Sequence, residues 1–269
     1  MVSLDAKLIA ALGASKAILV RVHAARGSVP REVGAWMAVF ADSTVGSVGG
    51  GHLEWQAIAR ARRMLQEMQC TEEIARFSLG ASLGQCCGGE VHLRFQRVGC
   101  EDVAALQGVL APARVPVALF GGGHVGSALM EVLSRLPMDL VWIDSREAIF
   151  DRDVPANVRC EHSDPVQDAV ADLPAHSRVL IMSFSHAEDL EVVAACLQRQ
   201  RTRDDLPYIG LIGSKTKWAS FRSKLRLRGY HDAEIDRVTC PVGIAGIVDK
   251  RPEVIAVAIA AQLLQVAPY

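Results

Sequence analysis

Val117-Ala-Leu-Phe-Gly121-Gly122-Gly123-His124-Val125-Gly126 is the stretch that decides the fold of the second half of this chain. Four apolar residues precede a G-x-G-x-x-G pattern, and Ser127-Ala-Leu-Met-Glu-Val-Leu133 continues with the composition of a helix. The next apolar segment, Met138-Asp-Leu-Val-Trp-Ile-Asp144, ends in an acidic residue 23 positions after Gly121. A strand, a glycine loop, a helix and a second strand ending in an acid are the parts of a Rossmann-type βαβ unit.

The glycines and the acid of this unit have separate physical tasks. Gly121 permits a tight turn, Gly123 lets a phosphate approach the backbone, and Gly126 lets the helix pack closely on the strand. The N-terminus of the helix offers unpaired N–H groups to an anion, and Asp144 is placed to accept a hydrogen bond from a ribose hydroxyl. A glycine turn without a ligand is the alternative, and the motif alone does not identify the ligand.

The composition of the 269-residue chain is that of an ordinary globular protein. Half of the residues are hydrophobic, 22% are charged and the net charge is −1, which argues against sequence-independent nucleic-acid binding. The longest apolar run near the C-terminus, Val254 to Leu264, is interrupted by Gln262 and is too short to span a bilayer. Seven cysteines without regular spacing fit reduced thiols better than a disulfide framework. With no signal-peptide pattern at its start, we expect a cytoplasmic protein that binds neither nucleic acid nor membrane.

Residues 1–100 are expected to form an α+β domain with a small, mostly antiparallel sheet. The hydrophobic patterns and turn residues predict helices over 3–15 and 52–68, and strands over 17–24, 35–41, 44–48, 73–79 and 91–98.

Residues 101–115 are expected to be a linker, or a short helix followed by a linker, and residues 116–269 a Rossmann-like domain. Strands are predicted over 116–120, 139–144, 157–160, 178–183 and 207–212, with helices between them. Apolar parallel strands covered on both faces predict a doubly wound sheet. The last helix is expected to begin near Pro252.

Two further glycine-rich segments, Gly49-Gly50-Gly51 and Gly213-Ser214, precede predicted helices and can present backbone N–H groups to an anion. Lys215 and Lys217 add positive charge to the second segment. The alternative is a turn whose lysines only contact solvent.

His124 lies inside the first glycine loop, and His186 follows the fourth strand predicted for this half. In a doubly wound sheet the first and fourth strands are neighbours and flank the crevice where ligands bind. Both imidazoles are therefore expected to reach one ligand, although a lone histidine is more often structural. Asp189 is expected either to orient His186 or to cap the helix that follows it.

Cys86-Cys87, between two glycine-bearing turns, is the most reactive pattern of the first half. Thiolates are soft ligands for molybdenum, copper(I) or zinc and can carry persulfide sulfur. Adjacent cysteines rarely bind one metal without strain, so one reactive thiol is favoured over a chelate, and a buried structural thiol is the alternative. The other five cysteines are expected to be packing residues, with Cys240 the least clear case.

Taken together, these motifs resemble the XdhC/CoxI family of xanthine dehydrogenase accessory proteins. The resemblance covers most of the chain and is carried by the blocks Gly27–Glu32, Gly49–Glu54, Gln85–Gly89, Gly121–Gly126, Trp142–Arg146, Ser185–Asp189, Tyr208–Lys217 and Cys240–Ile244. One departure is Phe184, at a position where the family usually has a smaller polar residue.

The resemblance implies a factor that binds and protects molybdenum cofactor (molybdopterin) and inserts it into apo xanthine dehydrogenase, without catalytic turnover of its own. It also suggests a homodimer and a cysteine desulfurase as a further partner. The cofactor-binding residues expected from the blocks are Gly121, Gly122, Gly123, His124, Val125, Gly126, Asp144, Ser145, Arg146, Ser185, His186, Gly213, Ser214, Lys215, Gly49, Gly50, Gly51, Glu54, Cys86 and Cys87. Cys86 and Cys87 are also the expected contacts of molybdenum or its labile sulfur.

Two other interpretations stay open at this point. An NAD(P)-dependent oxidoreductase that uses the Gly121–Asp144 unit would have a hydride-acceptor site near His186. A redox or metal regulator centred on Cys86-Cys87 would bind stoichiometric metal without a pterin. The ligand released from the purified protein separates these interpretations, because an oxidised pterin fluoresces and a nicotinamide cofactor has its own absorbance.

Overall fold

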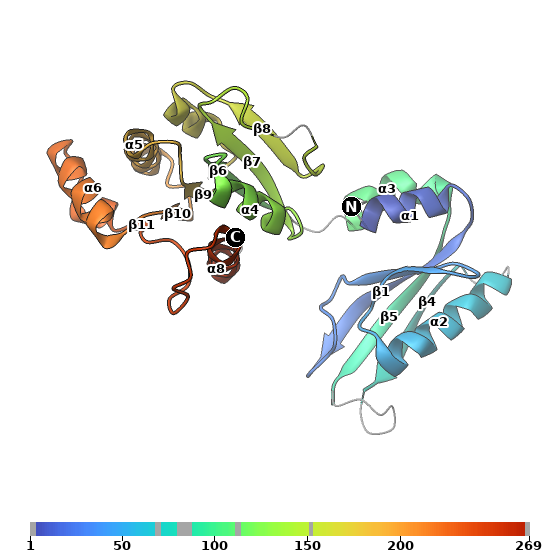
Figure 1. Ribbon diagram of the computed structural model, residues 1–269. Helices are drawn as coiled ribbons and strands as arrows, with labels where there is room; N and C mark the ends of the chain where they lie inside the picture. The colour runs from blue at the N-terminus through green and yellow to red at the C-terminus, as the bar shows by residue number, and fades with distance from the viewer. Residues whose placement is uncertain (1–3, 68–70, 80–87, 111–113, 151–152, 267–269) are drawn as a thin grey trace. The chain divides into compact units, whose positions relative to one another are not determined.

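The computed structural model describes all residues except 1–3, 68–70, 80–87, 111–113, 151–152 and 267–269. The chain forms two compact units, Met1–Pro112 and Ala113–Tyr269 (Figure 1). The first unit contains an antiparallel sheet and the second a parallel sheet of Rossmann type. Both parts of the fold class predicted from the sequence are thus confirmed.

The sheet of the first unit has the strand order β3-β2-β1-β5-β4. Its strands are β1 (Ala17–Arg26), β2 (Trp36–Val39), β3 (Thr44–Gly46), β4 (Glu72–Ser78) and β5 (Glu90–Val98). Helix α2 (Gly51–Gln66) covers one face, and α1 (Leu4–Leu12) and α3 (Val103–Leu110) cover the other. Successive side chains of a strand point to opposite faces, so the sheet separates two apolar layers.

Strand β1 shows this separation clearly. Ile18, Val20 and Val22 pack with α2, while Ala17 and Leu19 pack with α1 and α3. Residues 101–115 are predicted to be a linker or a short helix followed by a linker, and this stretch contains most of η2 (Cys100–Asp102) and all of α3. Helix α3 packs here because its Leu106 and Leu110 are buried in the same layer as α1.

The parallel sheet of the second unit has the strand order β11-β10-β9-β6-β7-β8. Its strands are β6 (Val115–Phe120), β7 (Met138–Asp144), β8 (Val158–His162), β9 (Arg178–Ile181), β10 (Tyr208–Leu211) and β11 (Val238–Thr239). Counted from β6, this is the order 3-2-1-4-5-6 of dinucleotide-binding sheets. The sequence did not indicate β11, because a two-residue strand carries no measurable periodicity.

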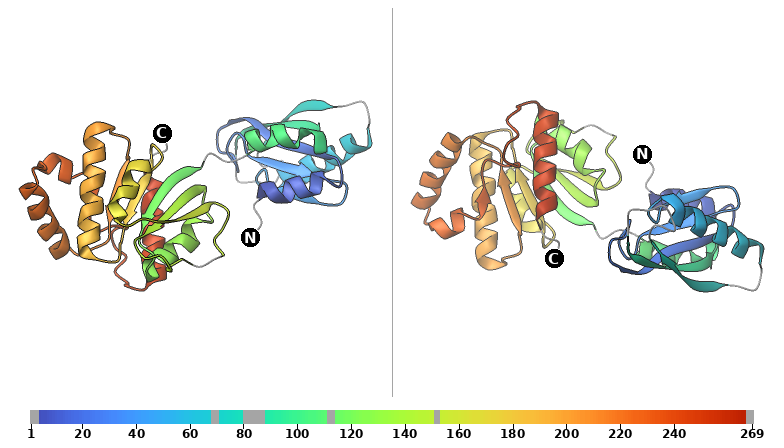
Figure 2. Two further views of the ribbon diagram at one scale, coloured as in Figure 1. Left: turned by 90° about the horizontal axis from the view of Figure 1, so that it is seen from above. Right: turned by 90° about the horizontal axis from the view of Figure 1, so that it is seen from below.

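Helices cover both faces of this sheet, as Figure 2 shows. Helices α4 (His124–Leu133) and α8 (Pro252–Gln265) pack on one face. Segment η3 (Val166–Asp172), α5 (His186–Thr202), α6 (Lys215–Leu227) and the short α7 (Asp232–Ile235) pack on the other. Strand β6 is consequently buried on both faces, which explains its continuous apolar sequence.

Candidate ligand-binding site

The point where the strand order reverses lies between β6 and β9. These strands pair in parallel from Val117↔Arg178 to Phe120↔Ile181. The exposed residues His124 and His186 begin the helices that follow β6 and β9. The two histidines therefore stand at the same edge of the sheet, as their sequence positions suggest, and contact with one ligand stays a prediction.

Two glycines of the loop after β6 are required by packing. Gly121 has φ +116°, and a Cβ there would lie 2.0 Å from the carbonyl oxygen of Met182. A Cβ at Gly126 would lie 2.0 Å from the carbonyl oxygen of Gly121. The indole Nε1 of Trp142 donates to that same oxygen at 3.0 Å. These contacts hold the loop tightly against β7 and β9.

Gly123 differs from its neighbours because it faces open space. A Cβ added there meets no atom within 4 Å. Gly123 is the N-cap of α4, and no side chain accepts a hydrogen bond from the first turn of that helix. The N-terminus of a helix attracts anions through its unpaired N–H groups. Gly123 therefore has the geometry of a phosphate-binding position.

Asp144 is buried, with an exposed fraction of 1%, and its carboxylate is occupied by the protein itself. Its oxygens accept hydrogen bonds from the N–H of Gly122 at 2.6 Å and from the backbone N, Nε and Nη2 of Arg146, each at 2.9 Å. Burial raises the pKa of this carboxyl, but the hydrogen bonds from Arg146 and Gly122 together lower the pKa by more than burial raises it. The pKa of Asp144 is therefore below its ordinary value. Four donors use the acceptor capacity of a carboxylate. The ribose contact therefore stays a prediction, and it would require the side chain of Arg146 to move.

Side chains of the loop after β7 contact the loop after β9 and the start of α5, across the end of β6, which lies between these strands. The hydroxyl of Ser145 donates to Glu188 Oε1 at 2.8 Å, and the guanidinium of Arg146 lies 4.5 Å from the ring centroid of Phe184. Glu188 Oε2 in turn accepts from the N–H of Phe184 at 3.1 Å. Ser185, an expected ligand contact, caps α5 by accepting from Glu188 N at 3.2 Å.

A buried ion pair lies beside the loop after β10. Lys217 Nζ donates to Asp189 Oδ2 at 2.5 Å and to the carbonyl oxygen of Ile212 at 2.8 Å, and the two side chains are 9% and 3% exposed. Asp189 also accepts from the N–H of Ser183 at 2.7 Å. The charge of Lys217 is thus neutralised within the protein. Sequence reasoning missed this pair because the two residues are 28 positions apart, although both lie in matching family blocks.

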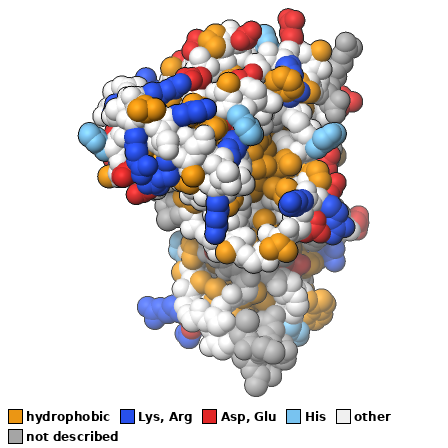
Figure 3. Space-filling view, turned by 60° about the vertical axis from the view of Figure 1, so that its left-hand side comes forward, with side chains coloured by type: hydrophobic (Ala, Val, Ile, Leu, Met, Phe, Trp, Pro, Cys, Tyr) orange, Lys and Arg blue, Asp and Glu red, His pale blue; other side chains and the backbone are white. Residues whose placement is uncertain are grey.

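The other residues predicted to bind an anion after β10 either have a structural contact within the protein or are exposed. Ser214 caps α6 by accepting from Lys217 N at 3.1 Å, and Lys215 is exposed. A Cβ at Gly213 would lie 2.8 Å from Lys217 Cδ, so this glycine makes room for the buried ion pair. Arg222 and Arg226 on α6 pair with the carboxylates of Asp236 and Asp232, and Arg228, directly after the helix, pairs with Glu191. Basic and acidic side chains are accordingly interspersed on the face that Figure 3 shows.

In the first unit, the loop Gly49–Gly51 holds a carboxylate of the chain. Glu54 Oε2 accepts from the N–H groups of Val48 at 3.0 Å and Gly50 at 3.1 Å, and from the hydroxyl of Ser47 at 2.5 Å. The N–H groups of Val48 and Gly50 therefore already have an anionic partner. Binding of an external anion by this loop stays a prediction, and it would require the carboxylate of Glu54 to move away from these N–H groups.

Three sequence blocks of the first unit meet at one end of its sheet. A Cβ at Gly49 would lie 2.6 Å from the ring carbons of Pro30, and Arg31 Nη1 donates to the carbonyl oxygen of Ser47 at 3.3 Å. A Cβ at Gly89 would lie 2.5 Å from the carbonyl oxygen of Ser28. The blocks Gly27–Glu32, Gly49–Glu54 and the end of Gln85–Gly89 are thus neighbours in space.

Cys86 and Cys87 lie outside the described residues, so their predicted role stays a prediction. Of the other cysteines, Cys196 is buried and Cys240 half-buried, and desolvation raises the pKa of their thiols to about 12 and about 11. Cys100 is exposed, so the expectation that it packs in a core is wrong for this residue. Within the described part of the chain, no group of three His, Cys, Asp or Glu side chains is placed to hold a metal ion.

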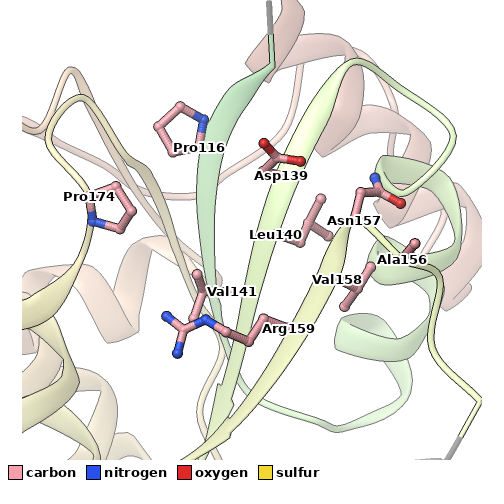
Figure 4. Close-up of a pocket in the computed structure, with 9 residues that line it drawn as sticks. All are labelled: Pro116, Asp139, Leu140, Val141, Ala156, Asn157, Val158, Arg159 and Pro174. Atoms are coloured by element: carbon pink, nitrogen blue, oxygen red, sulfur yellow. The ribbon is translucent and has the colours of Figure 1, made fainter. Parts of the chain in front are cut away.

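A separate cavity of about 230 Å³ opens at the other end of the parallel sheet. It is lined by Pro116, Asp139, Leu140, Val141, Ala156, Asn157, Val158, Arg159 and Pro174 (Figure 4). Most of these residues lie near the starts of β6, β7, β8 and β9, whereas ligands of such sheets bind at the carboxyl ends of the strands. We therefore place the candidate site at the glycine loop.

No helix in the described residues is long and apolar enough to cross a membrane.

Comparison with known proteins places the chain in a family. Residues 117–263 match the XdhC Rossmann domain, and residues 12–78 match the XdhC and CoxI family. The chain belongs to the XdhC family, as the resemblance of its motifs indicates. It is 27% identical over 245 residues to YqeB of Escherichia coli (strain K12), a match that covers 90% of this chain and only 42% of YqeB.

The fold is shared with a solved structure. A crystal structure from Bacillus halodurans, described as a xanthine dehydrogenase, superimposes with a TM-score of 0.78 at 20% sequence identity. The match covers 97% of this chain and 95% of that one. At 20% sequence identity the similarity shows that the two proteins share a fold.

Proposed function

We propose that the chain is an accessory protein of a xanthine dehydrogenase-type molybdenum hydroxylase, and that it binds, protects and inserts the molybdenum cofactor. The observation that carries this proposal is the open backbone at Gly123, at the switch point of a sheet in an XdhC-family member. Molybdenum cofactor is a phosphorylated pterin with a metal dithiolene, so its phosphate needs N–H donors that no carboxylate already occupies.

The polar groups beside Gly123 fit such a ligand. The hydroxyl oxygen of Ser183 is buried and has no hydrogen-bond partner among the described residues. Ser183 lies next to the glycine loop, because a Cβ at Gly121 would be 3.1 Å from its backbone nitrogen. A buried hydroxyl without a partner costs free energy that a ligand can recover. Ser183 would therefore meet a polar edge of the pterin, and His124 and His186 stand at the same edge of the sheet.

The alternative of an NAD(P)-dependent oxidoreductase receives less support from the geometry. A nicotinamide dinucleotide needs an acceptor for its ribose hydroxyls at the end of the second strand. Asp144, the residue at that place, already accepts four hydrogen bonds from the protein. The strand order alone does not distinguish the two ligands.

The test of the proposal is direct binding of cofactor by the full chain. Purified protein is incubated with molybdopterin, separated from free cofactor by gel filtration and oxidised, and the pterin fluorescence of the protein fraction is measured. We expect pterin in near-stoichiometric amount and no displacement by excess NAD⁺ or NADP⁺. Absence of pterin from the protein fraction, or its displacement by NAD⁺, would contradict the proposal.

We further propose that one thiol of Cys86-Cys87 contacts molybdenum or carries its labile sulfur. The double Cys86→Ser/Cys87→Ser variant should retain pterin binding, because a hydroxyl replaces each thiol with little change in volume and the backbone at Gly123 is unaltered. Its cofactor should nevertheless fail to activate the hydroxylase, since an alcohol is a poor soft ligand and sulfur carrier. Full activation by the double variant would rule out a role for these thiols.

A further inference from the structure

Phe184 is the residue at which this chain departs from the sequence pattern of its family, and the structure shows what it contacts. Phe184 has an exposed fraction of 66%. The guanidinium of Arg146 lies 4.5 Å from its ring centroid, within the range of a cation–π contact. Phe184 thus extends the loop after β9 towards the loop after β7.

Arg146 is held in this position from its other side. Its Nε and Nη2 donate to the two oxygens of Asp144, and its backbone N–H donates to Oδ1. A bidentate arginine–carboxylate pair fixes the direction of the guanidinium plane. Because Asp144 is buried, the side chain of Arg146 has little conformational freedom where it lies between Asp144 and Phe184.

A second contact joins the same two loops. The hydroxyl of Ser145 donates to Glu188 Oε1 at 2.8 Å, while Glu188 Oε2 accepts from the backbone of Phe184. Strand β6 lies between β7 and β9 in the sheet, so both contacts cross the end of β6 beside the glycine loop. A dinucleotide bound to a sheet of this order lies across the switch point, with one nucleotide on each side of its pyrophosphate.

We propose that Arg146 and Phe184 determine the size of the ligand, by filling the part of the crevice between the ends of β7 and β9. The inference rests on the proposed function and narrows it. The site accepts a cofactor that ends in a single phosphate, which binds at Gly123, and it rejects a cofactor extended by a nucleotide through that phosphate. The extension would have to displace Arg146 from both Asp144 and Phe184, and its ribose would find no acceptor at Asp144.

Calorimetric titration of the full chain with molybdopterin, and with molybdopterin extended by a nucleotide, tests this inference. We expect the wild-type protein to bind molybdopterin at least about tenfold more tightly, a difference of about 1.4 kcal/mol. In the Arg146→Ala/Phe184→Ser variant the crevice opens and two acceptor positions of Asp144 become free. The difference between the two ligands should then fall to about threefold or less. Phe184→Ser alone keeps the Asp144–Arg146 pair and should show an intermediate ratio.

Arg201→Ala is a matched control. The guanidinium of Arg201 lies 4.4 Å from the ring centroid of Tyr230 and pairs with Glu234, in the last turn of α5 and away from the glycine loop. Its removal should leave the ratio of affinities unchanged.

Three results would overturn the inference. If the wild-type protein binds both ligands equally, or the double variant discriminates as strongly as the wild type, these residues do not select the ligand and the proposed function stands. If neither ligand binds, the proposed function and the inference fail together. Circular dichroism of each variant shows whether it is folded before the titration is interpreted.

Discussion

Gly126 in the first turn of α4 and Gly123 at its N-cap should respond differently to substitution, the first through stability and the second through ligand binding. At Gly126, a Cβ would lie 2.0 Å from the carbonyl oxygen of Gly121, whereas real Cβ contacts essentially never fall below 3.0 Å, so the backbone has to move by about 1 Å. Overpacking of this kind costs about 1–3 kcal/mol, and the better helix propensity of alanine returns about 1 kcal/mol. We expect Gly126→Ala to lose up to about 2 kcal/mol of unfolding free energy, which lowers the melting temperature by about 4–8 °C.

Gly123→Val should instead keep the fold and lose the ligand. No atom lies within 4 Å of the added Cβ, and φ is −74°, so the substitution costs about 1 kcal/mol or less through the poorer N-cap. The side chain would occupy the space proposed for the phosphate, and we expect affinity for molybdopterin to fall more than about tenfold. Urea unfolding and calorimetric titration of both variants measure the two effects. Unchanged affinity in a folded Gly123→Val protein would refute the proposed phosphate position.

Three further results are expected. Asp189→Asn leaves the buried ammonium of Lys217 without its carboxylate and should lower the free energy of unfolding, measured in urea, by about 3–5 kcal/mol. The double variant Asp189→Asn/Lys217→Met should recover part of this loss of stability. A loss below about 1 kcal/mol in Asp189→Asn would contradict a buried ion pair. Because the folded pKa of Asp144 lies below its ordinary value, its contribution to stability is present at neutral pH and lost as the pH falls below about 4. Asp144→Asn should therefore flatten the decline of stability between pH 5 and pH 3, and an unchanged decline would show that other carboxyls cause it. With a pKa of about 11, about one in a thousand Cys240 thiols is ionised at pH 8, so peptide mapping after brief alkylation should find Cys240 modified far less than the exposed Cys100.

The layout of the second unit follows closely from its sequence, for identifiable reasons. Strands buried on both faces carry uninterrupted apolar residues, and the glycine loop and the spaced acid identify the first two strands. The order of the strands then places His124 and His186 at one edge. In contrast, β11 has only two residues, so local signals were too weak to assign it. In the first unit, α3 lies in a stretch that contains Ala111-Pro112-Ala113, and the sequence left a linker and a short helix followed by a linker as alternatives there.

The side-chain partners at the site could not be read from the sequence. The sequence places Asp144 at the end of a strand, but whether its carboxylate meets a ribose or a guanidinium depends on the direction that Arg146 takes. Similarly, Glu54 turns back onto the loop before its own helix, and this was not distinguished from a ligand contact. The meeting of the blocks around Gly27 and Gly89 depends on the long-range pairing of Arg26 with Glu90, which no local pattern records.

The proposed role as an insertion factor is tested by transfer of cofactor from the chain to the hydroxylase. The full chain is loaded with sulfurated molybdenum cofactor, freed of unbound pterin and mixed with molybdenum-free xanthine dehydrogenase, and xanthine oxidation is followed together with the pterin content of each protein after separation. We expect activity to rise in proportion to the pterin that leaves the chain, and Gly123→Val, which retains less cofactor, to produce correspondingly less activity. Cofactor that stays on the chain, or activity equal to that obtained with free cofactor alone, would contradict the proposed role.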